Sequence, residues 1–471
     1  MNYADFIQRK SQLTGFHGFE PLWLPDFLKP FQCALVEWSI RKGRSLIAAD
    51  CGLGKGPMLL VYAENVIRHV NKPFLLVSPL AVSLQFVSEA KKFGVEAAIS
   101  RDGKPRKNIT LTNYELLNKF DPDDYSGFGG DEISIIKHWT GKTQKVVTRF
   151  ASKFKYRLFC TATPSPNDFT EMGTLSEALG ELSYSDMLAT FFRQMSDDEK
   201  KKGATADDIV HSKRLSWRVI QSIGKWAMKP HAFEPFWKWV ASWARACRKP
   251  SDLGDFDDSE FVLPPLNRRD HVVVPRTAPP GYLFTVPAFG LNQERAERRR
   301  TLAERSELVA ELVKDSDSAT VWCSLNSEGD YLEKEIKGAV QVKGSQSMEK
   351  KEELILAFLS GQARVLVTKA KCAGLGLNMQ HCAHVVTFVT HSFQDFYQLV
   401  RRCWRFGQKR KVTLDVIATV GEVNVKKNME RKERSSSIMF DSVIGFMSQA
   451  LSVKNEKQAK VMEVPAWLVS K

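Results

Sequence analysis

The chain has 471 residues, of which 43% are hydrophobic and 26% charged, a balance that excludes an intrinsically disordered protein and favours two or three globular domains. Its formal net charge of +14 favours a polyanionic partner such as nucleic acid over a small acidic substrate. Eight scattered cysteines, no apolar run long enough for a bilayer and no secretory signal at the N-terminus predict a cytoplasmic protein with no membrane partner.

The first 28 residues mix aromatic residues, prolines and glycines without a clean period, and we expect an irregular lead-in. A helical stretch follows, and Gln32 lies near its start. Because an amide both donates and accepts hydrogen bonds, Gln32 can read the edge of an adenine base. A glutamine on an ordinary surface is the alternative.

A glycine-rich turn separates an apolar run at 45–49 from a helical stretch at 58–65. This order of strand, turn and helix is typical of a phosphate-binding loop, since glycines let backbone N–H groups converge on phosphate oxygens. The alternative is a turn between two core elements. The residues predicted to hold the phosphates of ATP are Gly52, Leu53, Gly54, Lys55 and Gly56.

Gly56 departs from the usual form of such a loop. A serine or threonine is expected directly after the lysine, where its hydroxyl holds Mg²⁺. Either water replaces that hydroxyl or metal binding is weakened. If the hydroxyl is what limits the rate, Gly56→Thr raises ATPase activity.

Further apolar runs at 74–80 and 109–114 alternate with helical stretches, which predicts a doubly wound α/β domain. Asp131 and Glu132 follow the glycine-rich segment 127–130. In ATPases such a pair supplies an aspartate for Mg²⁺ and a glutamate that orients the attacking water. A solvated turn is the alternative, and glycines inside a strand make its support weak.

Another predicted strand, residues 156–160, leads into a polar loop that contains Thr161 and Thr163. Hydroxyls at such an edge can sense the state of the nucleotide and couple it to domain motion. An ordinary turn of threonines and prolines is the alternative.

Residues 169–262 are predicted to be helical and are rich in tryptophan, with basic residues interleaved. These aromatic side chains could stack on nucleic-acid bases. Core packing is favoured, because Trp239 and Trp243 lie one helical turn apart. Residues 263–293 are expected to form a linker.

A second α/β pattern covers residues 294–424 and lacks a phosphate loop. Arg402 and Arg405 are three residues apart in a helical stretch, so they can share a face. Guanidinium groups presented across a cleft stabilise the charge of a γ-phosphate in the transition state. A basic solvated helix is the alternative.

The C-terminal extension, residues 425–471, is basic. Lys426, Lys427 and Arg431 are the candidates for contacts with nucleic-acid phosphates. A solvated helix face is again the alternative.

Seven motifs taken in order resemble those of the superfamily 2 helicases. The ending Arg402-Cys403-Trp404-Arg405-Phe406-Gly407-Gln408 looks most like the Swi/Snf-like branch and the DEAD/DEAH-like helicases encoded by phages. The motifs are Phe31-Gln32, Gly52 to Lys55, Ser78-Pro79, Asp131-Glu132, Thr161 to Pro164, Ala373 to Asn378 and Gln398 to Gln408.

The resemblance implies two RecA-like doubly wound parallel-sheet domains, at 29–168 and 294–424, with a helical insertion between them. It implies a monomer that uses ATP and Mg²⁺ and moves on nucleic acid, usually duplex DNA, in a bacterial or phage-infected cytoplasm. By the same resemblance Gly374, Gly376 and Gln398 contribute to the nucleotide site, and Ser78 and Thr112 touch the phosphate backbone.

Two functions remain open at this point. One is an ATP-dependent DNA helicase or duplex translocase. The other is a degenerate relative that binds ATP or DNA with little turnover, which Gly56 makes plausible. A nuclease finds no support, because no carboxylate cluster with basic neighbours lies outside these motifs.

Overall fold

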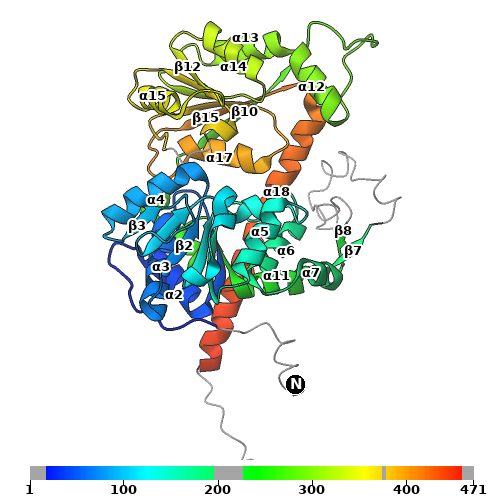
Figure 1. The fold of residues 1–471 in the computed structure, drawn as a ribbon. Helices are drawn as coiled ribbons and strands as arrows, with labels where there is room; N and C mark the ends of the chain where they lie inside the picture. The colour runs from blue at the N-terminus through cyan, green and yellow to red at the C-terminus, as the bar shows by residue number, and fades with distance from the viewer. Residues whose placement is uncertain (1–16, 196–225, 374–377, 459–471) are drawn as a thin grey trace, which may run out of the picture.

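The structure is a computed structural model that describes residues 17–195, 226–373 and 378–458. Two α/β lobes lie one above the other, and a long C-terminal helix runs alongside both (Figure 1). Each lobe is built on its own parallel sheet. The predicted fold class, two RecA-like doubly wound domains, is confirmed.

The first lobe contains a seven-stranded sheet in which every described pairing is parallel. In spatial order its strands are β3 (Ala97–Ile99), β4 (Ile109–Thr112), β2 (Phe74–Val77), β5 (Gly127–Asp131), β6 (Tyr156–Cys160), β1 (Arg44–Ala49) and β9 (Ala244–Cys247). Its helices are α2 (Pro30–Lys42), α3 (Lys55–Val70), α4 (Leu80–Lys92), α5 (Lys142–Ala151), α6 (Met172–Leu179), α7 (Tyr184–Phe191) and α11 (Phe233–Trp243). A separate antiparallel pair joins β7 (Phe192–Gln194) to β8 (Trp226–Met228).

Alternate residues of the central strands enter two separate cores. Leu75 and Val77 of β2 pack with α5, α6 and α11, whereas Phe74 and Leu76 pack with α2 and α3. Helices therefore cover both faces of the sheet, which is why these strands read as continuous apolar runs.

Strand β5 is a central, fully buried strand despite its glycines. The Phe74 ring on the neighbouring strand fills the space that side chains at 127 and 129 would take, since a Cβ on Gly129 would lie 2.9 Å from Phe74 Cε1. The glycines accommodate an aromatic neighbour, and the support for Asp131 is firmer than the sequence suggests.

The segment 169–262 was expected to be entirely helical. Its residues Ala244–Cys247 instead form strand β9 of the first lobe's sheet. The helix α11 ends at Trp243, and β9 pairs with β1 at the edge of the sheet. The tryptophans Trp237, Trp239 and Trp243 are buried in the core beneath it. The core interpretation of these side chains is thus confirmed for the described tryptophans of α11.

The second lobe has a six-stranded parallel sheet. In spatial order its strands are β10 (Leu266–Val273), β15 (Val412–Thr419), β14 (His384–Phe388), β11 (Ala319–Trp322), β13 (Val365–Thr368) and β12 (Ala339–Val342). Its helices are α12 (Gly290–Arg300), α13 (Leu302–Leu312), α14 (Asn326–Glu335), α15 (Met348–Leu359), α16 (Ala370–Ala373) and α17 (Phe393–Cys403).

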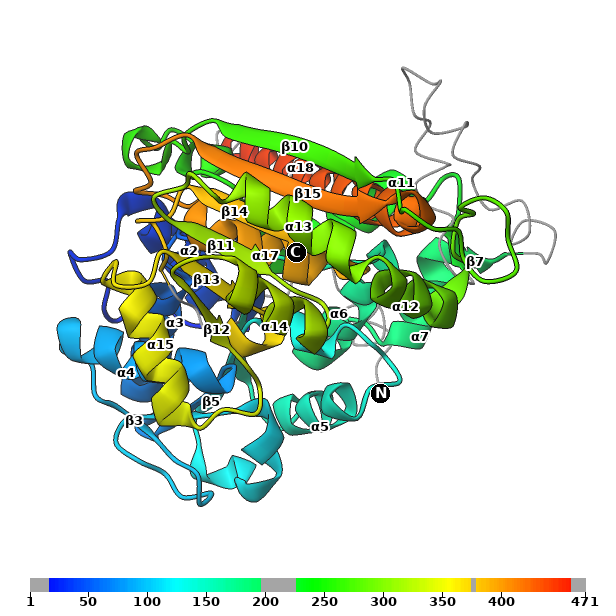
Figure 2. The ribbon, with the colours of Figure 1, turned by 90° about the horizontal axis from the view of Figure 1, so that it is seen from above.

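Strand β10 lies inside the range 263–293 that was expected to be a linker. It is an edge strand next to β15 (Figure 2). Its charged residues face partly into solvent, as is usual at a sheet edge. Because of the same charged residues, the sequence of this segment predicts a linker and not a strand.

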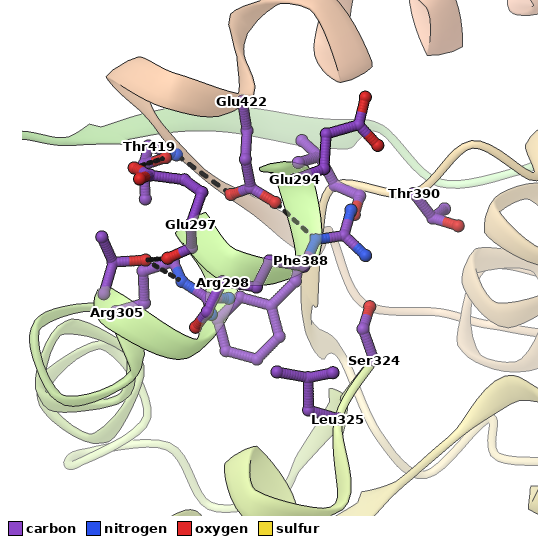
Figure 3. Close-up of polar contacts among 12 residues, drawn as sticks. Glu294, Glu297, Arg298, Arg305, Ser324, Leu325, Phe388, Thr390, Thr419 and Glu422 are labelled. Atoms are coloured by element: carbon purple, nitrogen blue, oxygen red, sulfur yellow. Dashed lines mark hydrogen bonds and ion pairs between the residues drawn. The ribbon is translucent and has the colours of Figure 1, made fainter. Parts of the chain in front are cut away.

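A polar network closes the carboxyl edge of the second sheet (Figure 3). Arg298 of α12 donates to Glu422 at 2.7 Å, and Thr419 at the end of β15 donates its hydroxyl to Glu297 at 2.9 Å. Arg305 of α13 donates to the backbone carbonyl of Arg298. These contacts fix α12 and α13 to the point where the long helix begins.

The long helix α18 (Val423–Gln458) belongs to both lobes. Val425 and Met429 near its start are part of the second lobe's core. Met439, Phe440 and Val443, three turns later, are part of the first lobe's core. The basic extension expected from residue 425 is therefore, in its described part, a packed structural element.

Candidate active site

The turn between β1 and α3 has the backbone of an anion-binding loop. Gly52 and Gly54 have φ of 91° and 81°, a left-handed conformation that favours glycine. A Cβ on Gly52 would lie 2.9 Å from the Phe406 ring of the second lobe. Leu53 between them is fully buried. The glycines are needed both for the turn and for the close approach of the other lobe.

Lys55 lies at the first turn of α3, behind this loop. Its Nζ donates to the carbonyls of Ala49 at 3.0 Å and Asp50 at 3.3 Å. Burial lowers the pKa of Lys55, but the neighbouring Cys51, Glu132 and Asp131 outweigh it, so the pKa lies above its ordinary value. The ammonium group is therefore held charged beside the loop.

Gln32 is used to support the loop. Its Nε2 donates to the Leu53 carbonyl at 2.8 Å, and its Oε1 accepts from the Lys29 backbone at 2.9 Å. A side chain on Gly54 would collide with the same amide. Each end of the amide makes one bond to the backbone, which leaves one N–H and one oxygen lone pair for a base edge. The adenine contact implied by the resemblance stays a prediction.

Asp131 ends β5, and Glu132 follows with φ of 50°. Burial, and then repulsion from Glu132, raise the pKa of Asp131 to about 7, while Lys55 acts in the opposite direction. Asp131 is only 7% exposed. Its Oδ1 has no hydrogen-bond partner among the described residues, a rare condition for a buried oxygen.

That oxygen fits a magnesium ion. Mg²⁺ takes one or two carboxylates and completes its shell with phosphates and water. In the described part of the chain no three His, Cys, Asp or Glu side chains gather into a metal site of their own. The free buried oxygen of Asp131 beside the loop is compatible with a metal that arrives on a nucleotide.

Thr161 and Thr163 lie just beyond β6, close to Glu132. The Thr161 hydroxyl is 3.4 Å from Glu132 Oε2 and 3.3 Å from the Ser134 hydroxyl, and it accepts from the Thr163 backbone at 3.1 Å. Gln394 of α17 donates to Ser134 at 2.7 Å. A chain of hydrogen bonds thus leads from Glu132 to the second lobe.

The second lobe presents three arginines at the cleft from α17 and the turn after it. Arg401 donates to Asp50 Oδ2 at 2.8 Å and to the Cys51 carbonyl at 3.0 Å, with 1% and 7% of the Arg401 and Asp50 side chains exposed. Tyr397 donates to the other oxygen of Asp50. This ion pair between the lobes was missed from the sequence, where Arg401 stands beside the two arginines of the motif without a distinguishing signal.

Arg405 and Arg402 lie near this pair. Arg405 Nε is buried without a partner among the described residues, and burial lowers its pKa, with Cys51 acting in the opposite direction. Arg402 is half-buried, and Gln398 lies one helical turn before it. Gly374 and Gly376 lie outside the described residues.

The candidate nucleic-acid contacts are only partly at the surface. Ser78 is fully buried and paired with Ser83 at 2.9 Å, and the Thr112 hydroxyl is buried. Ser78 follows β2 and Thr112 is the last residue of β4. Their contact with a phosphate backbone stays a prediction.

The basic residues of α18 also differ from one another. Lys426 lies 3.7 Å from Asp270 of β10, and Arg431 is bonded to Asn428. Burial lowers the pKa of Arg431, with Asp168 of the first lobe acting in the opposite direction. Lys427 is exposed. Only Lys427 among these three is free at the surface to meet a phosphate.

Gly56, the second residue of α3, faces a carboxylate of α4. A Cβ at this position would come closer than 3 Å to Glu89 Oε2. This contact could not be predicted, since Glu89 lies in an ordinary amphipathic stretch.

Fold and site together define a class, proteins with two RecA-like parallel-sheet lobes. Within it, residues 304–407 match the family described as the helicase conserved C-terminal domain. This match covers most of the second lobe. No curated protein matches the chain.

Among solved structures, the Sulfolobus solfataricus SWI2/SNF2 ATPase core in complex with double-stranded DNA is similar. It shares 17% identity at a TM-score of 0.41, over 95% of this chain and 99% of that one. A likeness at this level supports no function or partner. No helix in the described ranges is both long and apolar enough for a bilayer crossing.

Proposed function

We propose that the protein is a superfamily 2 helicase or translocase that hydrolyses ATP and moves on nucleic acid. One observation carries the proposal: the loop before Lys55, which lies within electrostatic range of Asp131, is contacted from the second lobe by Arg401 and lies near Arg405. The family match of residues 304–407 supports the same class.

Each residue has a role in this proposal. Loop amides and Lys55 bind the phosphates, Asp131 holds Mg²⁺, and Glu132 orients water for attack on the γ-phosphorus. Bound Mg²⁺ neutralises charge on the phosphate oxygens. Arg402 and Arg405 stabilise the charge that develops in the transition state.

Coupling to motion follows from the hydrogen bonds that reach across the cleft. Glu132 is joined through Thr161 and Ser134 to Gln394 of the second lobe. A change in the position of Glu132 during hydrolysis would therefore alter the hydrogen bond between Ser134 and Gln394 of α17. We propose that this path links the chemical step to rotation of the lobes.

The nucleic acid is proposed to be duplex DNA. The net charge of +14 supports a polyanion, and the order of motifs resembles the Swi/Snf-like branch. The kinship with phage-encoded enzymes belongs to the same proposal and rests on the motif ending at Gln408.

The test is ATP hydrolysis measured alone and with duplex DNA, single-stranded DNA or RNA. We expect duplex DNA to stimulate hydrolysis most, and Lys55→Ala to reduce the stimulated rate at least 100-fold. Lys91→Ala, which removes an exposed lysine of α4, is the matched control and keeps the rate. ATP binding without stimulated hydrolysis would instead identify a degenerate nucleotide-binding protein, which the glycine at position 56 favours.

A further inference from the structure

Glu89 occupies the space in which a phosphate loop normally carries a metal-binding hydroxyl. Gly56 directly follows Lys55, and a Cβ built there would come closer than 3 Å to Glu89 Oε2. A serine hydroxyl lies one bond beyond its Cβ. The carboxylate therefore lies within reach of the place that a hydroxyl at position 56 would take.

The position of Glu89 is fixed by its own helix. Gln85, one turn earlier on α4, donates to Glu89 Oε1 at 2.7 Å. Phe86 packs against the same spot, with its Cε1 3.7 Å from the Cβ built on Gly56. With Oε1 held by Gln85, Oε2 is the oxygen next to the start of α3.

Glu89 lies within electrostatic range of a second carboxylate and of two cations. Asp131, with its buried unpartnered Oδ1, is close enough for the Glu89 charge to raise its pKa, after burial and Glu132. Burial raises the pKa of Glu89, and Gln85, Lys92 and Arg405 act in the opposite direction. Two carboxylates, Glu89 on helix α4 and Asp131 at the end of strand β5, thus lie near the loop proposed to receive the phosphates.

We propose that Glu89 replaces the hydroxyl absent at Gly56 and, together with Asp131, holds the Mg²⁺ that accompanies ATP. The inference rests on the proposed function, since the metal arrives with the nucleotide. Two carboxylates with phosphate and water oxygens form an ordinary Mg²⁺ shell. On this view Gly56 is required to make room for Glu89.

A carboxylate differs from a hydroxyl in a way that can be measured. Its charge attracts Mg²⁺, but without the metal it repels the phosphates of ATP. Glu89→Gln should therefore weaken binding of Mg·ATP and leave metal-free ATP binding equal or tighter. A residue that only packs against α3 would change both affinities in the same direction.

The experiment is calorimetric titration of the full chain with ATP, once with Mg²⁺ and once with EDTA. For Glu89→Gln we expect at least tenfold weaker binding with Mg²⁺ and no weakening with EDTA. Glu96→Gln, at an exposed position, is the control and should change neither. Thermal unfolding of each variant checks that it is folded.

A second set of variants returns the hydroxyl. Gly56→Thr alone should weaken Mg·ATP binding, because its side chain displaces Glu89. In the double variant with Glu89→Ala, the ratio of ATP affinities with and without Mg²⁺ should return to within about threefold of the wild-type ratio. This reverses the simple expectation that a threonine at position 56 raises activity.

The outcomes separate the two proposals. If the wild type binds Mg·ATP and Glu89→Gln keeps the same ratio of affinities with and without Mg²⁺, the role of Glu89 is wrong and the ATPase proposal stands. If the wild type binds ATP under neither condition, both are wrong.

Discussion

Asp131 shows how the site alters the chemistry of a single side chain. Burial and the adjacent Glu132 raise its pKa to about 7 from an ordinary value of 3.8. Between these values the folded protein binds a proton that the unfolded chain releases. Stability is therefore lost as pH rises through that window.

Asp131→Asn removes this dependence. We expect the free energy of unfolding of the variant minus that of wild type to be about 1–3 kcal/mol larger at pH 8 than at pH 5, because only wild type loses stability over this range. Urea unfolding at the two pH values measures the difference. Glu96→Gln provides the exposed control, and equal pH slopes for Asp131→Asn and wild type would contradict the assignment.

Several residues of the site could be predicted individually, because each follows a recognisable turn or strand end. Lys55, Asp131 and Thr161 do lie together. Arg401 and Glu89 could not be predicted. Their partners, Asp50 and Gly56, are brought to them by tertiary packing, and neither contact leaves a spacing that can be read along the chain.

At the scale of single elements, β5 illustrates compensation between neighbouring strands. Gly127 and Gly129 leave a gap on one face of a central strand, and the Phe74 ring of β2 fills it. A large residue on one strand thus compensates for small residues on the neighbouring strand, so that the core volume between them stays filled.

Gly129→Val should destabilise the protein by about 1–3 kcal/mol through overpacking. The expected cause is contact with Phe74, so Phe74→Leu in the same chain should recover part of the loss. Chemical denaturation of the single and double variants measures the coupling. Additive effects of the two changes would show that Phe74 is not the obstacle.

Most strands were predictable, and the exceptions share a physical cause. β9 reads Ala-Arg-Ala-Cys after a helix, so local propensity favours continuing α11, but pairing with β1 overrides it. β10 reads as a charged connection because it is an edge strand with solvent on one side. Local sequence specifies the central strands well, whereas these two edge strands depend on their neighbours.

At the scale of the whole molecule, the buried pair of Arg401 and Asp50 joins the two lobes at the turn between β1 and α3. The Arg401 guanidinium also lies 5.1 Å from the Trp404 ring and 5.3 Å from the Phe406 ring. Removing one partner of such a pair leaves a buried charge uncompensated.

Arg401→Met should therefore destabilise the protein by about 3–5 kcal/mol, and adding Asp50→Asn should recover much of this loss. A double-mutant cycle on unfolding free energies gives the coupling. Near-zero coupling would mean that the lobes are held together without this contact.

The proposed contact of α18 with DNA can be tested by charge removal. Lys427 and Arg434 are exposed, whereas Lys426 lies near Asp270. Neutralising Lys427 and Arg434 together should reduce the dependence of log affinity on log salt by about 1–2. Lys426→Ala should have a smaller effect. If the slope of log affinity against log salt does not change in the double variant, these residues do not contact DNA and only face solvent.

The long helix α18 also bears on how the polypeptide is made. Its two anchoring segments need finished hydrophobic surfaces on both lobes, yet it is synthesised after either of them. We expect each lobe to acquire its sheet while the chain is still emerging from the ribosome, and the joined molecule to form only when this last piece docks.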